Sequence, residues 1–282
     1  MNTDNPIISV IVPCYNSEEY LAETLNSVLA QTCIDWECII VNDGSTDDSL
    51  RIAQEYVEKD KRFKVIDKKN EGPAIARNVG ITNASGKYIL PLDSDDKIAP
   101  TYLEKACSYL EKHPETKLVY CRGAYFGEMS GEWIQPQYKY EEMLWRNCIF
   151  CSAIYRRTDF DKTIGYNPNM VYGEEDWDFW LSFLSPNDIV YKIPEILFYY
   201  RRHGVSRNVF VVERIDESHS QIVLNHLSLY KPYLSGLMKW KSERDFYKKE
   251  LEKILQSKSY KLGRALLLPF RWIKDALKRD DM

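Results

Sequence analysis

Long apolar segments are absent from this chain of 282 residues. No uninterrupted apolar run is longer than Ala265–Phe270, which is far shorter than the roughly 20 residues that a membrane-spanning helix needs. The opening residues, Met1–Pro6, carry no basic segment, and the apolar run after them ends at Pro13 without a small-residue cleavage site. We therefore expect neither a transmembrane helix nor a secretory signal, and we predict a cytoplasmic protein.

Histidine and cysteine are too few and too scattered for a dedicated zinc site. The chain has four histidines and seven cysteines. Cys148 and Cys151 have CxxC spacing, but a structural zinc site would need a second such pair, and the sequence has none. Cysteines spread through apolar runs fit a reducing compartment, where they serve as small core residues.

Glycine-rich phosphate loops are missing as well. No GxxxxGK[ST] occurs in the sequence, and no GxGxxG follows the first apolar run. These absences argue against a P-loop nucleotidase and against a dinucleotide-binding Rossmann domain. If the chain binds a nucleotide, its phosphates must be held in another way, for which a metal ion is the obvious means.

The small net charge of −4 hides an uneven distribution along the chain. Residues 231–282 contain 14 Lys and Arg against 7 Asp and Glu, so the body that precedes them is acidic. An acidic body argues against nucleic acid as a partner, because neutralising phosphates requires a basic face.

Apolar runs, polar turns and helical patterns alternate over the first third of the chain. The β-branched runs Ile7–Val12 and Cys38–Val41 lack polar alternation, which is typical of strands buried on both faces. Each is followed by a polar turn and by apolar residues at helical spacing. With further strands predicted over Phe63–Ile66 and Tyr88–Leu92, these units predict an α/β protein with a Rossmann-like, mostly parallel sheet flanked by helices.

The later elements follow a weaker pattern. We predict a catalytic domain over residues 1–210 and a helical C-terminal extension over 211–282. Within the domain the sequence favours a loop region over residues 123–140, helices over Pro100–Lys112 and Glu174–Leu184, and strands over Lys117–Arg122, Ile149–Tyr155, Ile189–Ile193 and Ile196–Tyr200.

An acidic cluster, Asp93-Ser94-Asp95-Asp96, directly follows the strand predicted over Tyr88–Leu92. Asp93 and Asp95 are one residue apart on an extended segment, so their carboxylates face the same side and repel each other unless a cation or hydrogen-bond donors stabilise them. Mg²⁺ or Mn²⁺ suits such ligands and also binds substrate phosphates. A solvated acidic loop is the alternative, but ligands of parallel sheets bind at this end of the strands.

Five motifs together carry a resemblance to a known family: ISVIVPCYNSEEYL, CIIVNDGSTDDS, NEGPAIARNVGI, GKYILPLDSDD and GEEDWDFWL. In order and spacing they resemble the family 2 glycosyltransferases of the GT-A fold, over roughly residues 6–206. The resemblance implies inverting transfer of a sugar from a nucleoside diphosphate sugar, here expected to be a UDP-hexose or UDP-N-acetylhexosamine. A divalent metal, Mn²⁺ or Mg²⁺, is the cofactor that it implies.

The resemblance also implies where the nucleotide binds. Pro13 and Tyr15 match positions that wall the base, and Asp43 matches the carboxylate at the base edge. Arg77 matches a basic residue near the nucleotide, although an arginine on a helix could equally form a surface ion pair.

By the same matching, Asp93, with Ser94 beside it, lies near the ribose, and Asp95 ligates the metal that bridges the two phosphates. We expect Asp93 and His203 to complete the protein's metal ligands. His203 belongs to the segment YRRHGVS, which also resembles the family, and a surface histidine is the alternative.

A carboxylate is needed to accept the proton of the acceptor hydroxyl as it attacks the sugar. The resemblance assigns this general base to Asp176, with Glu175 as the second candidate. Both stand at the start of the predicted helix Glu174–Leu184, where acidic residues are common because they interact favourably with the helix dipole.

The acceptor and the tail are predicted from other features. The QxxRW signature of processive relatives is absent, which favours addition of one sugar to a glycan or lipid-linked glycan acceptor. Ser259–Lys278 combines a regular apolar face with Lys and Arg, the pattern of an interfacial helix that binds an anionic membrane surface. This predicts a peripheral protein on the inner face of the cytoplasmic membrane, with packing on the catalytic domain or on a second subunit as the alternative.

Two other functions fit parts of the sequence. A sugar nucleotidyltransferase also joins such a sheet to paired carboxylates, but it should carry a Gly-, Arg- and Lys-rich loop where this chain has PCYNSEE. A catalytically inactive, sugar-nucleotide-binding scaffold of a glycan-synthesis complex is the non-enzymatic alternative.

Overall fold

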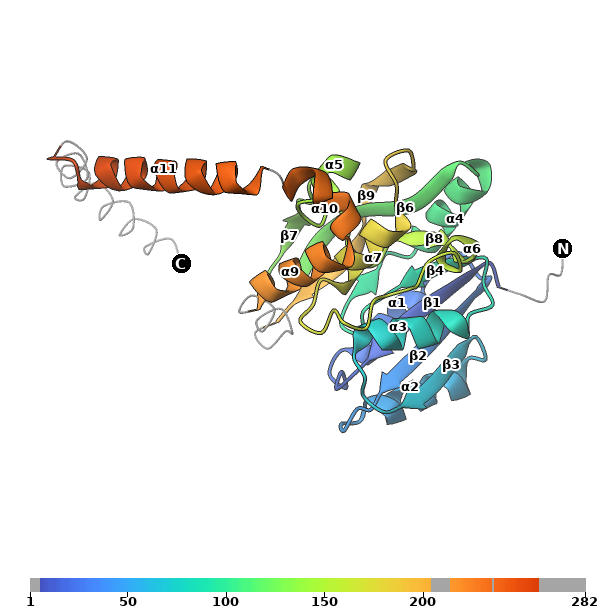
Figure 1. Cartoon of the computed structure of the whole chain (residues 1–282). Coiled ribbons are helices and arrows are strands. Elements are labelled where there is room, and N and C mark those ends of the chain that lie inside the picture. Colours follow the sequence, from blue (N-terminus) through green and yellow to red (C-terminus); the bar gives the residue numbers. More distant parts are fainter. Residues whose placement is uncertain (1–5, 204–213, 235, 259–282) are drawn as a thin grey trace. The chain divides into compact units, whose positions relative to one another are not determined.

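A computed structural model describes residues 6–203, 214–234 and 236–258 of the protein (Figure 1). The chain divides into two compact units, residues 1–227 and 228–282. The predicted domain boundary, between residues 210 and 211, falls outside the described residues. The first unit contains the sheet and all the predicted site residues.

Among the described residues, the first unit is built around one mixed sheet of nine strands. Its order is β3-β2-β1-β4-β8-β6-β9-β5, with β7 paired to β6. Most paired residues lie in parallel ladders, so the predicted α/β class with a mostly parallel sheet is confirmed. The strands are β1 (Ile8–Cys14), β2 (Trp36–Asp43), β3 (Phe63–Lys68), β4 (Tyr88–Pro91), β5 (Lys97–Ile98), β6 (Thr116–Gly127), β7 (Gly131–Trp133), β8 (Ile154–Arg156) and β9 (Ile189–Arg202).

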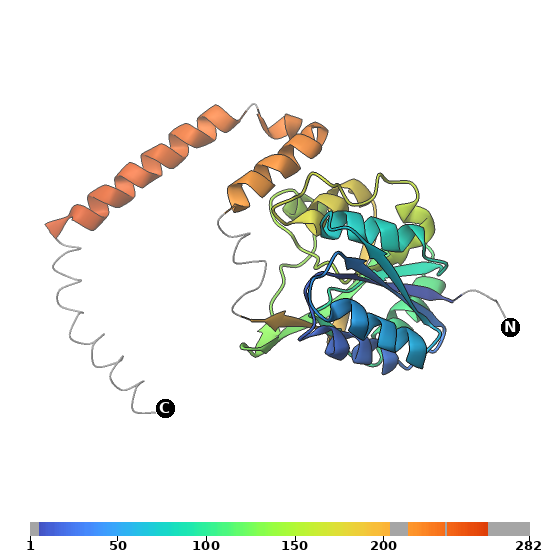
Figure 2. The ribbon, with the colours of Figure 1, turned by 90° about the horizontal axis from the view of Figure 1, so that it is seen from below.

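Helices cover both faces of the first half of the sheet (Figure 2). α1 (Leu21–Leu29) and α2 (Ser49–Lys59) lie on one face and α3 (Pro73–Thr82) on the other, because the chain reverses its direction across the sheet after β3 and the crossovers stay right-handed. β1 and β2 are therefore buried along their whole lengths, which explains their apolar runs without alternation. α3 packs so closely that a Cβ on Gly80 would lie 2.4 Å from Ile11 Cγ2.

The strand order reverses beside β1, whose neighbours are β2 and β4. In open parallel sheets the crevice at the carboxyl ends of the strands, next to such a reversal, is the usual place for a ligand. The polar turns after β1, β2 and β4 all lie at this edge.

The second half of the sheet differs from the prediction in three places. The segment predicted as a loop over residues 123–140 is partly strand, because β6 continues to Gly127 and β7 pairs back onto it. The two strands predicted over residues 189–200 are the single strand β9, which bulges opposite Arg122. The strand predicted over Ile149–Tyr155 is reduced to β8. The helices of this part are α4 (Tyr102–Lys112), α5 (Tyr140–Met143), α6 (Arg157–Phe160) and α7 (Glu175–Phe183).

The remaining described residues are helical, as predicted from about residue 212 onward. α9 (Ile215–Asn225) belongs to the first unit, α10 spans Leu227–Leu234, and α11 (Leu237–Gln256) belongs to the second unit. The segment Ser259–Lys278, predicted to bind a membrane, lies outside the described residues. In the part of the chain that the structure describes, no helix is both long and apolar enough to cross a membrane.

Candidate active site

Three polar turns are joined to one another at the carboxyl edge of the sheet. Asn16, in the turn after β1, accepts a hydrogen bond from the Thr46 N–H at 2.8 Å. The Ser17 N–H donates to Ser49 Oγ at 2.8 Å, and Ser17 Oγ lies 2.7 Å from Ser94 Oγ. The turns after β1, β2 and β4 therefore form one polar structure, which brings the first, second and fourth sequence motifs together.

Asp43 ends β2 and is buried, with both carboxylate oxygens bound by the segment after β3. Lys68 Nζ lies 2.6 Å from Oδ1, which also accepts the Glu71 N–H at 3.0 Å, while Oδ2 accepts the Gly72 N–H at 2.8 Å. Burial alone would lower the pKa of Lys68, but hydrogen bonds with Asp43 and Glu71 outweigh it and raise that pKa. Pro13 is buried within β1, and Tyr15, beside it, is half exposed.

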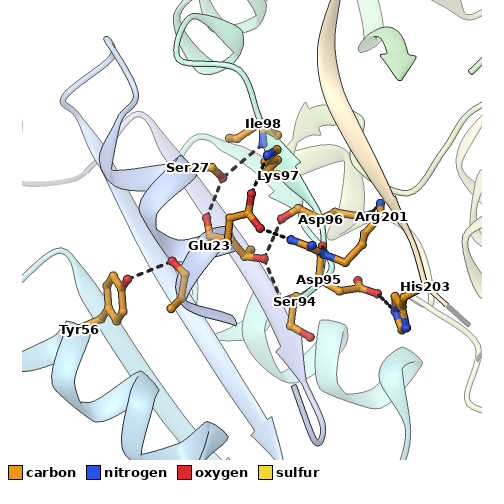
Figure 3. A network of polar contacts seen from close by, with 12 residues as sticks. Glu23, Ser27, Tyr56, Ser94, Asp95, Asp96, Lys97, Ile98, Arg201 and His203 are labelled. Carbon is orange, nitrogen blue, oxygen red and sulfur yellow. Dashed lines mark hydrogen bonds and ion pairs between the residues drawn. The ribbon is translucent and has the colours of Figure 1, made fainter. Parts of the chain in front are cut away.

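The acidic segment after β4 is held by α1 and β9 (Figure 3). Thr24 Oγ1 lies 2.9 Å from the Ser94 carbonyl oxygen and 2.7 Å from that of Asp96. The Asp96 side chain is buried, and its Oδ1 accepts the Arg201 N–H at 2.8 Å. Burial and the charges of Asp95 and Asp93 raise the pKa of Asp96 well above its ordinary value.

The Arg201 side chain forms a hydrogen bond, an ion pair and contacts with two aromatic rings. Its Nε donates to the Asp95 carbonyl oxygen at 2.8 Å, and its guanidinium pairs with Glu23. The guanidinium also lies over the rings of Tyr20 and Phe126, 4.6 and 4.2 Å from their centres. This arginine therefore fixes the backbone of the acidic segment (Figure 3).

Asp95 and His203 meet across this segment, as Figure 3 shows. Asp95 Oδ2 lies 3.2 Å from His203 Nε2, and the histidine ring packs 4.8 Å from that of Tyr20. Burial and the charge of Asp93 raise the pKa of Asp95. Within residues 6–203, 214–234 and 236–258, no group of three or more His, Cys, Asp or Glu side chains is arranged to hold a metal ion. An ion bound by Asp95 and His203 would therefore take its other ligands from water and from substrate phosphates.

Arg77 lies on α3 but is buried, unlike most arginines on helices. Its side chain is only 3% exposed, with one terminal nitrogen 2.5 Å from Asp93 Oδ1 and the other 2.7 Å from Glu175 Oε1. Asp93 Oδ2 also accepts a weak hydrogen bond from the Cys151 thiol at 3.4 Å. The structure thus brings Asp93 and Glu175 together through one guanidinium.

Asp176, in the first turn of α7, has an environment of its own. Its Oδ2 accepts a hydrogen bond from Asn147 at 3.0 Å, and its Oδ1 accepts the Trp177 N–H at 2.8 Å. Burial and the charge of Glu175 raise the pKa of Asp176 to about 6. Glu174 precedes this turn with a left-handed backbone (φ 61°), a strained conformation that is uncommon outside functional sites.

Trp177 and Trp180 belong to the core. Both are buried, and their indole N–H groups donate to the backbone carbonyls of Met143 and Ile149. Asp178, also buried, accepts hydrogen bonds from Asn225 at 2.7 Å and from His226 at 3.0 Å, which ties α7 to the end of α9.

An α/β sheet that gathers an Asp-Ser-Asp segment and an acidic helix start at its carboxyl edge has the architecture of a GT-A glycosyltransferase. Residues 9–176 match the family described as Glycosyl transferase family 2. The chain is 31% identical over 246 residues to an uncharacterized glycosyltransferase of Haemophilus influenzae, covering 80% of this chain and 74% of the relative. The protein therefore belongs to glycosyl transferase family 2.

Another relative is the putative teichuronic acid biosynthesis glycosyltransferase TuaG of Bacillus subtilis, 33% identical over 215 residues, or 74% of this chain and 84% of TuaG. Among solved structures, S. aureus TarS 1-349 in complex with UDP superposes with a TM-score of 0.61 and 26% identity over 77% of this chain. The chain covers 64% of that TarS fragment.

A mannosyltransferase from Pyrobaculum calidifontis, solved with GDP-Man and Mn²⁺, shares the fold at 18% identity, with a TM-score of 0.63 over 95% of this chain and 82% of that one. The predicted family and GT-A fold are thus confirmed.

Proposed function

We propose that the protein is an inverting glycosyltransferase of cell-envelope polysaccharide synthesis, which moves one sugar from a UDP-sugar to a hydroxyl of a glycan or lipid-linked glycan. One observation carries the proposal: buried Arg77 pairs with both Asp93, in the Asp93-Ser94-Asp95 segment, and Glu175, the neighbour of Asp176. A relative named for teichuronic acid biosynthesis supports the class of acceptor, and a different protein, solved in complex with UDP, supports the class of donor.

The nucleotide would bind at the edge formed by the turns after β1 and β2. Tyr15 is exposed there and offers a ring face to a base. Asp43 is held rigid by Lys68 and by two backbone N–H groups, so its position does not depend on the ligand. A rigid carboxylate at the base edge selects a base that presents an N–H, as uracil does.

Asp95 and His203 would hold the divalent metal. One carboxylate and one imidazole leave most coordination positions to the diphosphate and to water, which is how Mg²⁺ and Mn²⁺ bind nucleotides. When bound, the ion stabilises the negative charge that develops on the departing nucleoside diphosphate. Asp93 is engaged by Arg77 and Cys151 in this structure, so we assign it a place beside the ribose and leave the metal to the other two residues.

Asp176 would remove the proton from the attacking hydroxyl. Its pKa of about 6 leaves it ionised near neutral pH and still basic enough to accept a proton in the transition state. The Asn147 amide and the Trp177 N–H orient the carboxylate. Glu175 is the weaker candidate, because its carboxylate is buried and already paired with Arg77.

A panel of nucleotide sugars tests this proposal. UDP-glucose, UDP-N-acetylglucosamine and GDP-mannose are each added with Mn²⁺, and both the melting temperature and the release of nucleoside diphosphate are followed. A ligand at a hundred times its dissociation constant should stabilise the protein by about 2.7 kcal/mol. A UDP-sugar is expected to shift the melt, whereas a shift by GDP-mannose alone would contradict the donor assignment.

The acidic residues provide the second half of the test. D95N and D176N should each abolish transfer, with D161N, at an exposed aspartate after α6, as the matched control. Full transfer by D176N would refute the assignment of the base. A donor-dependent thermal shift without any transfer by the wild-type chain, over a panel of glycan acceptors, would identify an inactive scaffold instead.

A further inference from the structure

Arg77 stands at the centre of the candidate site without reaching its surface. It lies on α3, and its side chain is 3% exposed. A guanidinium is a planar fork, and here its two terminal nitrogens point to two different carboxylates, Asp93 at 2.5 Å and Glu175 at 2.7 Å. The remaining nitrogen, Nε, is buried and has no hydrogen-bond partner among the residues that the structure describes.

The two partners come from distant parts of the chain. Asp93 lies 16 residues after Arg77 and Glu175 lies 98 residues after it. Asp93 is two residues from Asp95 on the donor side, and Glu175 is adjacent to Asp176 on the acceptor side. One guanidinium therefore ties the donor half of the site to the helix that carries the base.

We propose that Arg77 is a positioning residue, which fixes the acidic segment after β4 and the start of α7 at the separation that the transfer requires. This inference rests on the proposed function and deepens it. Because both terminal nitrogens are already bound by the protein and the side chain is covered, Arg77 does not itself contact the nucleotide. Its place is set by packing on Tyr166, whose ring centre lies 5.4 Å from the guanidinium carbon.

Arg77 also balances the charge around Asp176. The ionisable groups that face Asp176 are Glu174 and Glu175 on its own segment, Arg77 on α3 and Cys151 before β8. Glu175 raises the pKa of Asp176, and Arg77 lowers it. A change at either residue should therefore move the pH at which the base becomes active.

R77K separates positioning from ligand binding. Lysine keeps the charge, but its single ammonium cannot reproduce a planar fork that holds both carboxylates. We expect kcat to fall about 10- to 100-fold, while the dissociation constant of the UDP-sugar, measured by thermal shift with Mn²⁺, changes less than about twofold because no nucleotide contact is lost. A weakening of donor binding in proportion to the loss of kcat would overturn the inference.

R62K is the matched control. Arg62 also pairs with an aspartate, Asp60, and lies over an aromatic ring, Trp36, but it precedes β3 at the opposite edge of the sheet. We expect this variant to keep the wild-type kcat and donor affinity. An equal loss of kcat in R62K would show that replacing any paired arginine disturbs the protein, and this would contradict a specific role for Arg77.

E175Q is the second variant, and it decides the question even if R77K does not fold. Glutamine still offers an oxygen to Arg77 but removes one negative charge beside Asp176. We expect the acidic limb of the kcat/KM profile to move to lower pH while donor affinity stays unchanged. An unmoved limb together with weaker donor binding would overturn the role of the Arg77 link.

The failure of the proposed function would look different from the failure of this inference. Loss of all activity in E175Q, together with an active D176N, would transfer the role of base to Glu175. That result would refute the proposed assignment of the base. In contrast, an inactive D176N combined with a donor-binding defect in R77K would refute the positioning role alone.

Discussion

At the scale of single residues, the molecule places chemically identical aspartate side chains in different electrostatic environments. Asp43 and Asp93 are paired with Lys68 and Arg77, whereas burial and the neighbouring carboxylates raise the pKa of Asp96. Asp176 lies between these extremes, because two hydrogen bonds favour its ionised form while burial and Glu175 oppose it. Four aspartates of the candidate site therefore lie in different electrostatic environments.

The pKa of Asp176 predicts the pH dependence of transfer. Because a general base works only when it is deprotonated, and the pKa of this group is raised to about 6, kcat/KM should fall about tenfold for each pH unit below 6. Above about pH 7 it should level off. A profile measured at saturating Mn²⁺ between pH 5 and 8 checks this, and a limb centred near pH 4 would contradict the raised pKa.

The pairing of Asp95 with His203 predicts how the enzyme depends on metal. H203A should raise the Mn²⁺ concentration needed for half-maximal activity about 10- to 100-fold, because one of two protein ligands is lost. H113A is the control, since His113 pairs with Glu115 in the exposed turn after α4. Activity of H203A that is restored by excess Mn²⁺ is the expected result, and an unchanged metal requirement would exclude His203 as a ligand.

Sequence alone predicted Asp93, Asp95 and Asp176 as site residues, because they stand in motifs with characteristic spacing. It could not identify the groups that hold them. Thr24 binds a segment 70 residues away, and Asn147 binds Asp176 from 29 residues away. A threonine in a helix or an asparagine in a loop carries no signal of such a partner, because the contact exists only after the chain has folded.

At the scale of elements, the acidic segment is positioned mainly by α1. The buried Thr24 hydroxyl lies within hydrogen-bond distance of the carbonyl oxygens of Ser94 and Asp96. Glu23, next to it, forms ion pairs with Lys97 and Arg201 (Figure 3). Two adjacent residues of one helix thus hold the acidic segment after β4 in place.

T24V tests this role of α1, because valine keeps the shape of threonine and removes its hydroxyl. Leaving two buried carbonyls without that donor should lower the free energy of unfolding by about 1–3 kcal/mol, measured by urea denaturation, and should weaken Mn²⁺-dependent donor binding. T82V is the control, since the Thr82 hydroxyl bonds only within its own exposed turn of α3. Equal stability of T24V and the wild type would contradict this account.

The two halves of the sheet were not equally predictable. β1 to β4 are short strands joined by helices, and burial on both faces gives β1, β2 and β4 a recognisable apolar run. β6 and β9 have 12 and 14 residues, and many of these residues are partly exposed. The two strands pair in parallel across a bulge, and helix α7 lies between them in sequence. Aromatic residues of the two strands, such as Tyr125 and Tyr200 with ring centres 6.2 Å apart, pack on one another and do not follow a simple alternation.

At the scale of the whole molecule, the basic C-terminal segment makes a prediction that concerns location. Each Lys or Arg near an anionic bilayer contributes about 1 kcal/mol to binding. We expect the full chain to sediment with vesicles containing phosphatidylglycerol and to be released by high salt, and a chain ending at residue 258 to stay in solution with unchanged donor binding. Sedimentation of both chains alike would contradict the membrane role of Ser259–Lys278.

Asp178 has a consequence for attempts to graft the C-terminal part of one relative onto another. The buried Asp178 carboxylate, two residues after the predicted base, accepts hydrogen bonds from both Asn225 and His226 at the end of α9. A chimera joined before α9 would keep this helix docked only if the incoming segment supplied the same Asn-His pair. Without that pair, the buried Asp178 carboxylate of α7 would lose both of these hydrogen-bond partners. This dipeptide therefore decides whether the two halves of such a hybrid are compatible.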